Sequence, residues 1–443
     1  MKKLSILILI NIIFAQTSKK ANVAIYKDGT ALVKQEIVWD NIPKGESIIK
    51  YDDIPKSIQK DTPFISIENV QVLNQKFVEK IFSTNNYFSS KKGDYITVKL
   101  KNEKAVSGNL LEISSSLLTI QSKYSVRSFN RDNIEYIETK DNISTPNFSP
   151  YLQWEIKNNK AGKVKASLVY KLGNVSWDAI YRLTTNGQTE GELVVEGVIF
   201  NNSSKDYFNA NINLIEGIIN KSKPKQTNNY SEMAMSRSVV QKNTPAELGD
   251  YYIYSTGSIQ SFTSGENITV GIYGPLKVNY EKVYVFENFE RQKKDEPLRI
   301  EYTLSNTEKD GLGIVLPAGK VDIYTNSNKG GFEFIGSDNI GQVPKGESSK
   351  IQAGYAFDIT GKRKVINYDR QRKSEEAVIE VALNNSKSET ASVKVVEHIN
   401  GDWVIREPSH DYIKEDASTI HFLIDVEPGK KEFITYTYRK EWK

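Results

Sequence analysis

Alternation of apolar and polar residues with a period of two constrains this chain more than any other feature. Residues 378–383 and 420–424 show it clearly, and turn sequences containing Asn, Pro or Gly adjoin them at residues 384–387 and 427–430. Alternating β-branched and aromatic residues between such turns are typical of half-buried strands. No long segment has the i, i+3, i+4, i+7 spacing and the capping residues of a helix. The sequence therefore predicts an all-β, multidomain fold made of β-sandwich units and barrels.

Composition excludes several classes of function. The chain has 443 residues, no cysteine and three histidines, and its 59 Lys and Arg residues nearly balance 55 Asp and Glu residues. This length corresponds to roughly two to four domains. Without cysteine there are no disulfides, thiol nucleophiles, iron–sulfur clusters or cysteine-based zinc sites. A nucleic-acid-binding protein needs a concentrated basic surface, so the balanced charge argues against a nucleic-acid partner.

Residues 1–15 match a secretory signal peptide. Lys2 and Lys3 form its positive region, residues 4–14 form its apolar region, and Ala15 is the small residue expected before the cut. A membrane anchor is the alternative, but spanning the hydrocarbon layer takes about 20 apolar residues. We expect cleavage after Ala15 and an extracytoplasmic mature protein, periplasmic or secreted, without a transmembrane span.

Composition divides the rest of the chain into three parts. We expect an N-terminal β domain over residues 16–87, a small β-barrel over residues 88–141, and one or more β-sandwich domains over residues 142–443. The last part is interrupted at about residues 222–266, where Ser, Thr, Asn, Gln and Lys dominate. Such a stretch buries too little apolar surface to offset its ordering entropy, so we expect a flexible excursion there. The strand pattern is expected to resume near Asn267.

The small unit contains five short strand-like segments within about fifty residues, with Gly108 inside a strong bend. This order resembles an SH3/Sm-like barrel inserted between the other domains. Barrels of this kind that bind nucleic acid use basic grooves and stacking aromatics. Acidic residues nearly cancel the basic residues of this unit, so nucleic acid is not the expected ligand. The five segments are residues 93–100, 106–111, 117–121, 126–129 and 134–137.

Six short motifs resemble a known family. In order along the chain they are YKDGTALV at residues 26–33, VSWDAIY at 175–181, LPAG at 316–319, VDIY at 321–324, FIG at 334–336 and GYAFD at 354–358.

The motifs after residue 150 resemble the domain-of-unknown-function family that forms the C-terminal half of mucoidy-inhibitor-A-like proteins. The opening motif resembles the N-terminal domain of the same proteins. The resemblance implies a β-rich fold and leaves the mechanism open, because no catalytic residues are agreed for the family. Longer relatives have a helical coiled coil between the two ends, where this chain has the small unit. The role of that coiled coil is therefore not carried over.

No catalytic or metal-binding constellation stands out. His398, His410 and His421 are twelve and eleven residues apart, which does not match the spacing of a hydrolytic zinc site. The chain lacks a Gly-x-Ser-x-Gly elbow between strand and helix, and no pair of carboxylates is singled out for glycoside hydrolysis. No glycine-rich loop opens a helix, so we expect no cofactor. We assign no catalytic, cofactor-binding or metal-ligating residue.

Five aromatic residues are candidates for interaction. Trp177 and Tyr181 could form a platform on which a sugar stacks, but the interpretation favoured by their strand context is anchoring of a sandwich core. Tyr251, Tyr252 and Tyr254 lie beside the polar stretch and are typical of an interface. The alternative for these tyrosines is a loop clamp folded onto its own domain.

These observations favour a non-enzymatic, extracytoplasmic binding or assembly module of the cell envelope. Strand-rich modules bind through loops and exposed sheet edges, so the expected partner is a protein or a glycan of the envelope. Two alternatives stay open. One is a secreted hydrolase acting on polysaccharide or peptide, and the other is a structural subunit of a surface assembly.

Overall fold

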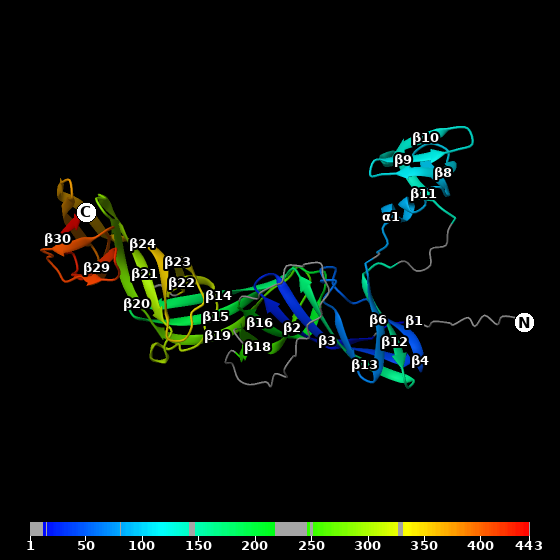
Figure 1. The fold of residues 1–443 in the computed structure, drawn as a ribbon, viewed down its shortest axis with the longest axis horizontal. Helices are drawn as coiled ribbons and strands as arrows, with labels where there is room; N and C mark the ends of the chain where they lie inside the picture. The colour runs from blue at the N-terminus through cyan, green and yellow to red at the C-terminus, as the bar shows by residue number, and fades with distance from the viewer. Residues whose placement is uncertain are drawn as a thin grey trace, which may run out of the picture. The chain divides into compact units, whose positions relative to one another are not determined.

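The computed structural model describes residues 12–14, 16–79, 81–140, 147–217, 246–248, 251–326 and 331–442. Strands make up 68% of the structure and helices 3%, so the prediction of an all-β fold with several sheets is confirmed (Figure 1). Within the described residues no helix has the length and apolar character needed to cross a membrane.

The chain folds into two compact units, which we describe separately. Unit 1 comprises Met1–Val23, Leu32–Asn174 and Asn202–Ala210, and unit 2 comprises Ala24–Ala31, Val175–Asn201 and Asn211–Lys443. This division differs from the domain boundary expected at residue 142. The reason is that the strands between residues 151 and 173 pair with strands from the first eighty residues, and sequence alternation does not reveal pairing partners.

The N-terminal part of unit 1 is built around two tryptophans. Trp39 and Trp154 are fully buried and meet edge to face, with ring centroids 6.0 Å apart. One sheet has the order β1-β4-β12-β6, and β5 pairs with β13. The strands are β1 (Ile12–Phe14), β2 (Gln16–Tyr26), β3 (Thr30–Ile42), β4 (Gly45–Tyr51), β5 (Phe64–Ile67), β6 (Val70–Val78), β12 (Tyr151–Asn158) and β13 (Gly162–Gly173).

Strand β1 belongs to the predicted leader. Its backbone pairs in parallel with β4. Residues 1–11 and Ala15 lie outside the described residues, so the cleavage after Ala15 stays a prediction.

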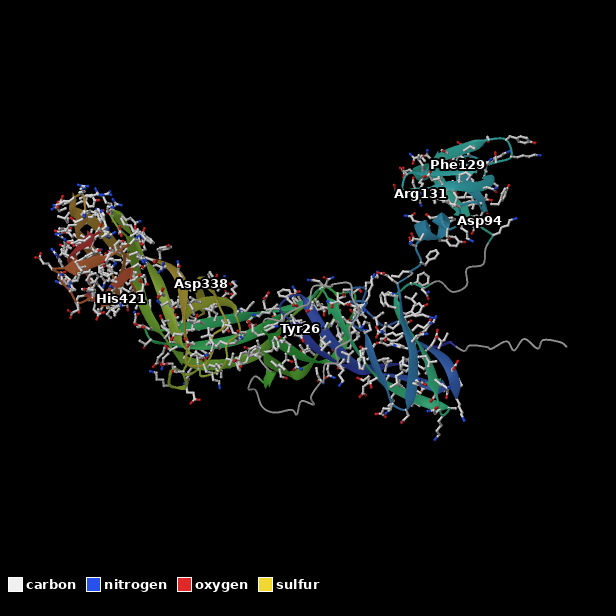
Figure 2. All side chains as sticks on the ribbon, in the orientation of Figure 1. Tyr26, Asp94, Phe129, Arg131, Asp338 and His421 are labelled. Atoms are coloured by element: carbon white, nitrogen blue, oxygen red, sulfur yellow. The ribbon has the colours of Figure 1, made fainter. Side chains whose placement is uncertain are left out.

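The small unit is one antiparallel sheet of order β10-β9-β8-β7-β11. Gly108 lets β8 approach β9, because a Cβ atom there would lie 2.5 Å from the carbonyl oxygen of Gln121. Arg131, labelled in Figure 2 with Asp94 and Phe129, donates to Asn85 Oδ1 (2.8 Å) and Ser114 O (3.0 Å). The strands lie close to the five predicted segments, while the SH3/Sm-like barrel itself stays a prediction. The elements are α1 (Thr84–Ser89), β7 (Tyr95–Leu100), β8 (Val106–Ile113), β9 (Leu117–Gln121), β10 (Val126–Asn130), the 3-10 helix η1 (Arg131–Asn133) and β11 (Ile134–Glu138).

The first part of unit 2 contains a sheet of order β19-β15-β14-β22-β23, in which β14 and β22 are parallel. Strand β16 lies beside β18, and β18 lies beside β17. The strands are β14 (Val175–Asn186), β15 (Glu190–Asn201), β16 (Tyr207–Glu216), β17 (Ala246–Leu248), β18 (Tyr251–Phe262), β19 (Asn267–Asn279), β22 (Gly319–Asn326) and β23 (Phe332–Ile340).

The excursion expected at residues 222–266 needs a correction at its end. Residues 218–245 and 249–250 lie outside the described residues, but β17 and β18 are regular paired strands. Strand structure therefore resumes before Asn267. Tyrosine and isoleucine at the start of β18 favour a strand, and burial of Tyr254 and Phe262 anchors it.

A nine-stranded sheet forms the C-terminal part of unit 2, in the order β27-β30-β25-β24-β21-β20-β26-β29-β28. Side chains from both halves of this sheet share one core, in which the rings of Phe422 and Tyr436 lie 5.6 Å apart. The elements are β20 (Glu281–Phe289), β21 (Lys294–Ser305), η2 (Glu308–Asp310), β24 (Ser348–Arg370), β25 (Ser374–Asn385), β26 (Ala391–His398), β27 (Trp403–Arg406), β28 (Ile413–Lys414), β29 (Thr419–Val426) and β30 (Lys431–Glu441).

Candidate functional site

Trp177 and Tyr181, two of the sequence candidates, lie on the buried face of β14. Both side chains are 0% exposed. The Trp177 indole donates to the carbonyl oxygen of Ile215 (3.1 Å), and the Tyr181 hydroxyl donates to that of Pro317 (2.5 Å). Stacking a sugar on either ring would require this core to open. Their position matches that of core anchors.

An ion pair lies against the same indole. Lys27 Nζ is 2.8 Å from Glu216 Oε2 and 4.8 Å from the centroid of the Trp177 ring. Glu216 Oε1 accepts a hydrogen bond from the backbone N–H of Ala318 (3.2 Å), and Lys27 donates to the carbonyl of the same residue. Three of the motifs that carry the family resemblance therefore meet at one partly buried point within unit 2.

The three tyrosine candidates lie on β18. Tyr254 is buried, with its ring 6.0 Å from Trp177 and 6.2 Å from Tyr273, and burial raises its pKa. Tyr251 and Tyr252 are half-buried. A Cβ atom at Gly217 would overlap the ring of Tyr251, so this ring packs against its own unit. The structure thus brings Trp177 and Tyr254 together and leaves Tyr251 and Tyr252 partly accessible.

The three histidines do not form a common site. His398 Nε2 lies 2.9 Å from Glu287 Oε1, and its ring stacks on Phe289. His421 Nδ1 lies 2.8 Å from a carboxylate oxygen of Glu415, whereas His410 contacts a neighbouring serine. Among the described residues no group of three or more His, Asp or Glu side chains is arranged to bind a metal ion.

A cleft of about 370 Å³ in the C-terminal part of unit 2 gathers charged side chains from four separate segments. Among the described residues that line it are four carboxylates, three cationic side chains and one indole. We call it the charged cleft. Its lining residues are Glu290, Arg291, Arg370, Glu375, Asn400, Gly401, Asp402, Lys440, Glu441 and Trp442.

A buried ion pair positions one wall of the charged cleft. Arg363 Nε donates to both carboxylate oxygens of Glu397, at 3.1 and 3.0 Å, and both side chains are almost fully buried. Arg363 also donates to the carbonyl oxygen of Gln292 (2.6 Å). Burial alone lowers the pKa of Arg363, but the Glu397 carboxylate outweighs it and keeps the guanidinium charged. The pair therefore fixes the turn after β20 that carries Glu290 and Arg291.

Two carboxylates of the charged cleft are themselves held in place. Glu290 accepts from Lys440 and from the backbone N–H of Asn400. Glu375 is buried and accepts from the Tyr438 hydroxyl (3.3 Å). Burial raises the pKa of Tyr438, and Glu375 and Glu290 raise it further, so this phenol stays protonated as a donor.

The aromatic and cationic groups of the cleft are partly open. Trp442 is 38% exposed, its indole N–H donates to the carbonyl oxygen of Arg372 (3.1 Å), and the Arg370 guanidinium lies 5.9 Å from its ring. Arg291 donates to the Tyr368 hydroxyl (3.2 Å). The cleft therefore presents fixed hydrogen-bond donors and acceptors beside an accessible indole.

Sequence reasoning missed the charged cleft because its residues share no fixed spacing. They come from turns and strand ends that are far apart in sequence and belong to one folded sheet, in which β25 pairs with both β24 and β30. One signal was present: Glu397 falls in the same period-two alternation as Val393 and Val395, on the strand face that is otherwise apolar. A charge at such a position indicates a buried ion pair.

Comparison of the sequence with models of known protein families and with curated proteins finds no match. The resemblance to mucoidy-inhibitor-A-like proteins thus depends on the six motifs and stays a prediction.

Proposed function

We propose that the protein is a non-enzymatic binding module of the cell envelope that takes a glycan in the charged cleft. The observation that carries this proposal is the combination of a partly exposed indole with fixed donors and acceptors. Sugar hydroxyls both donate and accept hydrogen bonds, and so fit a wall of carboxylates and guanidiniums. Sugar C–H faces pack on aromatic rings, so Trp442 provides an apolar surface for them.

Binding is favoured over hydrolysis because the two enclosed carboxylates already have donors. Glu290 is paired with Lys440, and Glu375 accepts from Tyr438. The acid and the nucleophile of a glycoside hydrolase must face the scissile bond, whereas these two carboxylates already accept bonds from protein donors. The cleft thus fits recognition of a ligand better than proton transfer to it.

The test is a calorimetric titration of the purified protein with envelope polysaccharides and with oligosaccharides made from them. We expect saturable binding that W442A weakens about tenfold, in line with the loss of one aromatic contact. F357A is the matched control, because Phe357 is 89% exposed on β24 and does not line the cleft. Equal binding by W442A and the unchanged protein would place the ligand elsewhere.

The secreted hydrolase remains a second candidate because Glu290 and Glu375 line one cleft. It predicts release of reducing ends from the bound polysaccharide. E290Q or E375Q would abolish that release while leaving the binding of the polysaccharide intact. Binding of the polysaccharide without release of reducing ends supports the binding module and contradicts the hydrolase.

A further inference from the structure

A second cleft, of about 550 Å³, lies in unit 1 beside the small sheet, where α1 and β11 meet the segment before α1. We call it the aromatic cleft. Four of the seven described residues that line it are aromatic, and one carries a charge. They are Phe82, Tyr87, Phe88, Tyr136, Ile137, Glu138 and Thr139.

The aromatic walls are fixed and partly open. Tyr87 lies 5.8 Å from Phe82 and 5.2 Å from Phe88, measured between ring centroids. The Tyr87 hydroxyl is 2.8 Å from Thr139 Oγ1, and the backbone N–H of Phe82 donates to the carbonyl oxygen of Asn147 (2.7 Å). Tyr136 is 47% exposed and Phe82 is 36% exposed, so a ligand can reach both rings.

The charge of the aromatic cleft decides which ligand fits. Glu138 is exposed on β11, and it is the one charged side chain among the described lining residues. Aromatic rings attract cations through their negative faces, and a carboxylate adds to that attraction. A neutral apolar ligand would desolvate Glu138 without pairing it.

One cation–π interaction, between Lys91 and Tyr87, is already present beside this cleft. Lys91 Nζ lies 5.7 Å from the Tyr87 ring centroid and 3.5 Å from Asp94 Oδ2. Among the described residues Glu138 forms no ion pair, so its charge is accessible to a ligand.

We propose that the aromatic cleft binds an alkylated ammonium group of the choline type. Hard inorganic cations prefer several carboxylate or carbonyl ligands, and Glu138 is the one side-chain carboxylate among the described lining residues. A primary ammonium is strongly hydrated, whereas a quaternary ammonium is the ligand for which aromatic cages are known. The site lies in a different unit from the charged cleft and does not depend on the glycan proposal.

The test uses the full chain and two probes of equal shape, choline and its uncharged isostere 3,3-dimethylbutan-1-ol, titrated by calorimetry and by saturation-transfer NMR. We expect choline to saturate one site and the isostere to bind at least about tenfold more weakly. Failure of choline to saturate, or equal affinity of the two probes, would overturn the proposal.

Variants connect that binding to the aromatic cleft. Y136A should weaken choline binding at least about tenfold, and E138Q should weaken it about fivefold without affecting the isostere. Y124A is the matched control, because Tyr124 is 87% exposed in the turn between β9 and β10 and does not line the cleft. Circular dichroism checks that each variant is folded. Loss of binding in Y124A, or none in Y136A, contradicts the assignment.

A further arm distinguishes free choline from a choline headgroup. Vesicles of phosphatidylcholine are compared with vesicles of phosphatidylglycerol in a flotation assay. Recovery of the protein with phosphatidylcholine alone, lost in Y136A, supports the cation site and assigns it to a lipid. No recovery with either vesicle, together with saturation by choline, supports the site and assigns it to a soluble ligand. Equal recovery with both vesicles, retained in Y136A, contradicts the lipid headgroup as the source.

Discussion

At the scale of single residues, Trp177 and Trp442 show how position decides the role of one side chain. Trp177 lies on the inward-facing side of β14 with Val175, Ala179 and Tyr181, and all four side chains are buried. Trp442 directly follows β30 and is 38% exposed. The same type of side chain therefore anchors a core at position 177 and can contact a ligand at position 442.

His421 provides a prediction at this scale. The pKa of His421 is lowered, mainly by burial and also by the nearby cations Lys394 and Lys350. Glu415 raises this pKa but does not outweigh them. Around and below pH 6.5 the unfolded chain therefore binds more protons than the folded one, so stability rises with pH. We expect the free energy of unfolding to decrease as the pH falls from 7 to 5, and H421Q to reduce that decrease.

Urea denaturation at pH 5, 6 and 7 measures the effect. H410Q is the matched control, since His410 lies near the surface beside Ser409. The prediction is contradicted when H421Q keeps the full pH dependence of the unchanged protein.

At the scale of elements, β23 and β24 approach each other closely at one glycine. A Cβ atom at Gly336 would overlap the backbone of Ala353. Nearby, the backbone N–H of Gln352 donates to Asp338 Oδ2 (2.8 Å), and Asp338 is labelled in Figure 2. Glycine is thus required at position 336 because there is no room for a Cβ atom, and not because the backbone is left-handed.

Replacing this glycine should separate the two strands. We expect G336A to lower the free energy of unfolding by about 1–3 kcal/mol, the usual cost of overpacking. G341A is the control, because nothing lies within 4 Å of a Cβ atom at that position. Urea titration of the two variants measures the difference, and equal stability would show that the backbone shifts without strain.

At the scale of the whole molecule, strands and compact units do not coincide. Strands β2, β3 and β16 each contribute residues to both units. A strand can pair with different partners along its length, so a boundary based on composition misses such a division. The predicted boundary at residue 142 differs from the structure for this reason.

Export also belongs to this scale, and we propose that the mature protein is extracytoplasmic. N-terminal sequencing of the protein from its native host should find Gln16 as the first residue, because Ala15 fits the cleavage position. A15E should retain the leader, while the neighbouring K19A should not. A native product that starts at Met1 or Lys2 would contradict export.

What the sequence by itself determined is local. Alternation gives each strand one apolar face, so the positions of the strands in the small unit and the all-β class could be read from residue order alone. The tertiary structure decided what residues far apart in sequence do together. Glu290 and Lys440 meet across 150 residues, and Lys27 reaches the Trp177 ring, because the fold brings together segments that are far apart in the sequence. Pairing depends on complementary faces and turn geometry over the whole sheet, and no short segment of sequence contains that information.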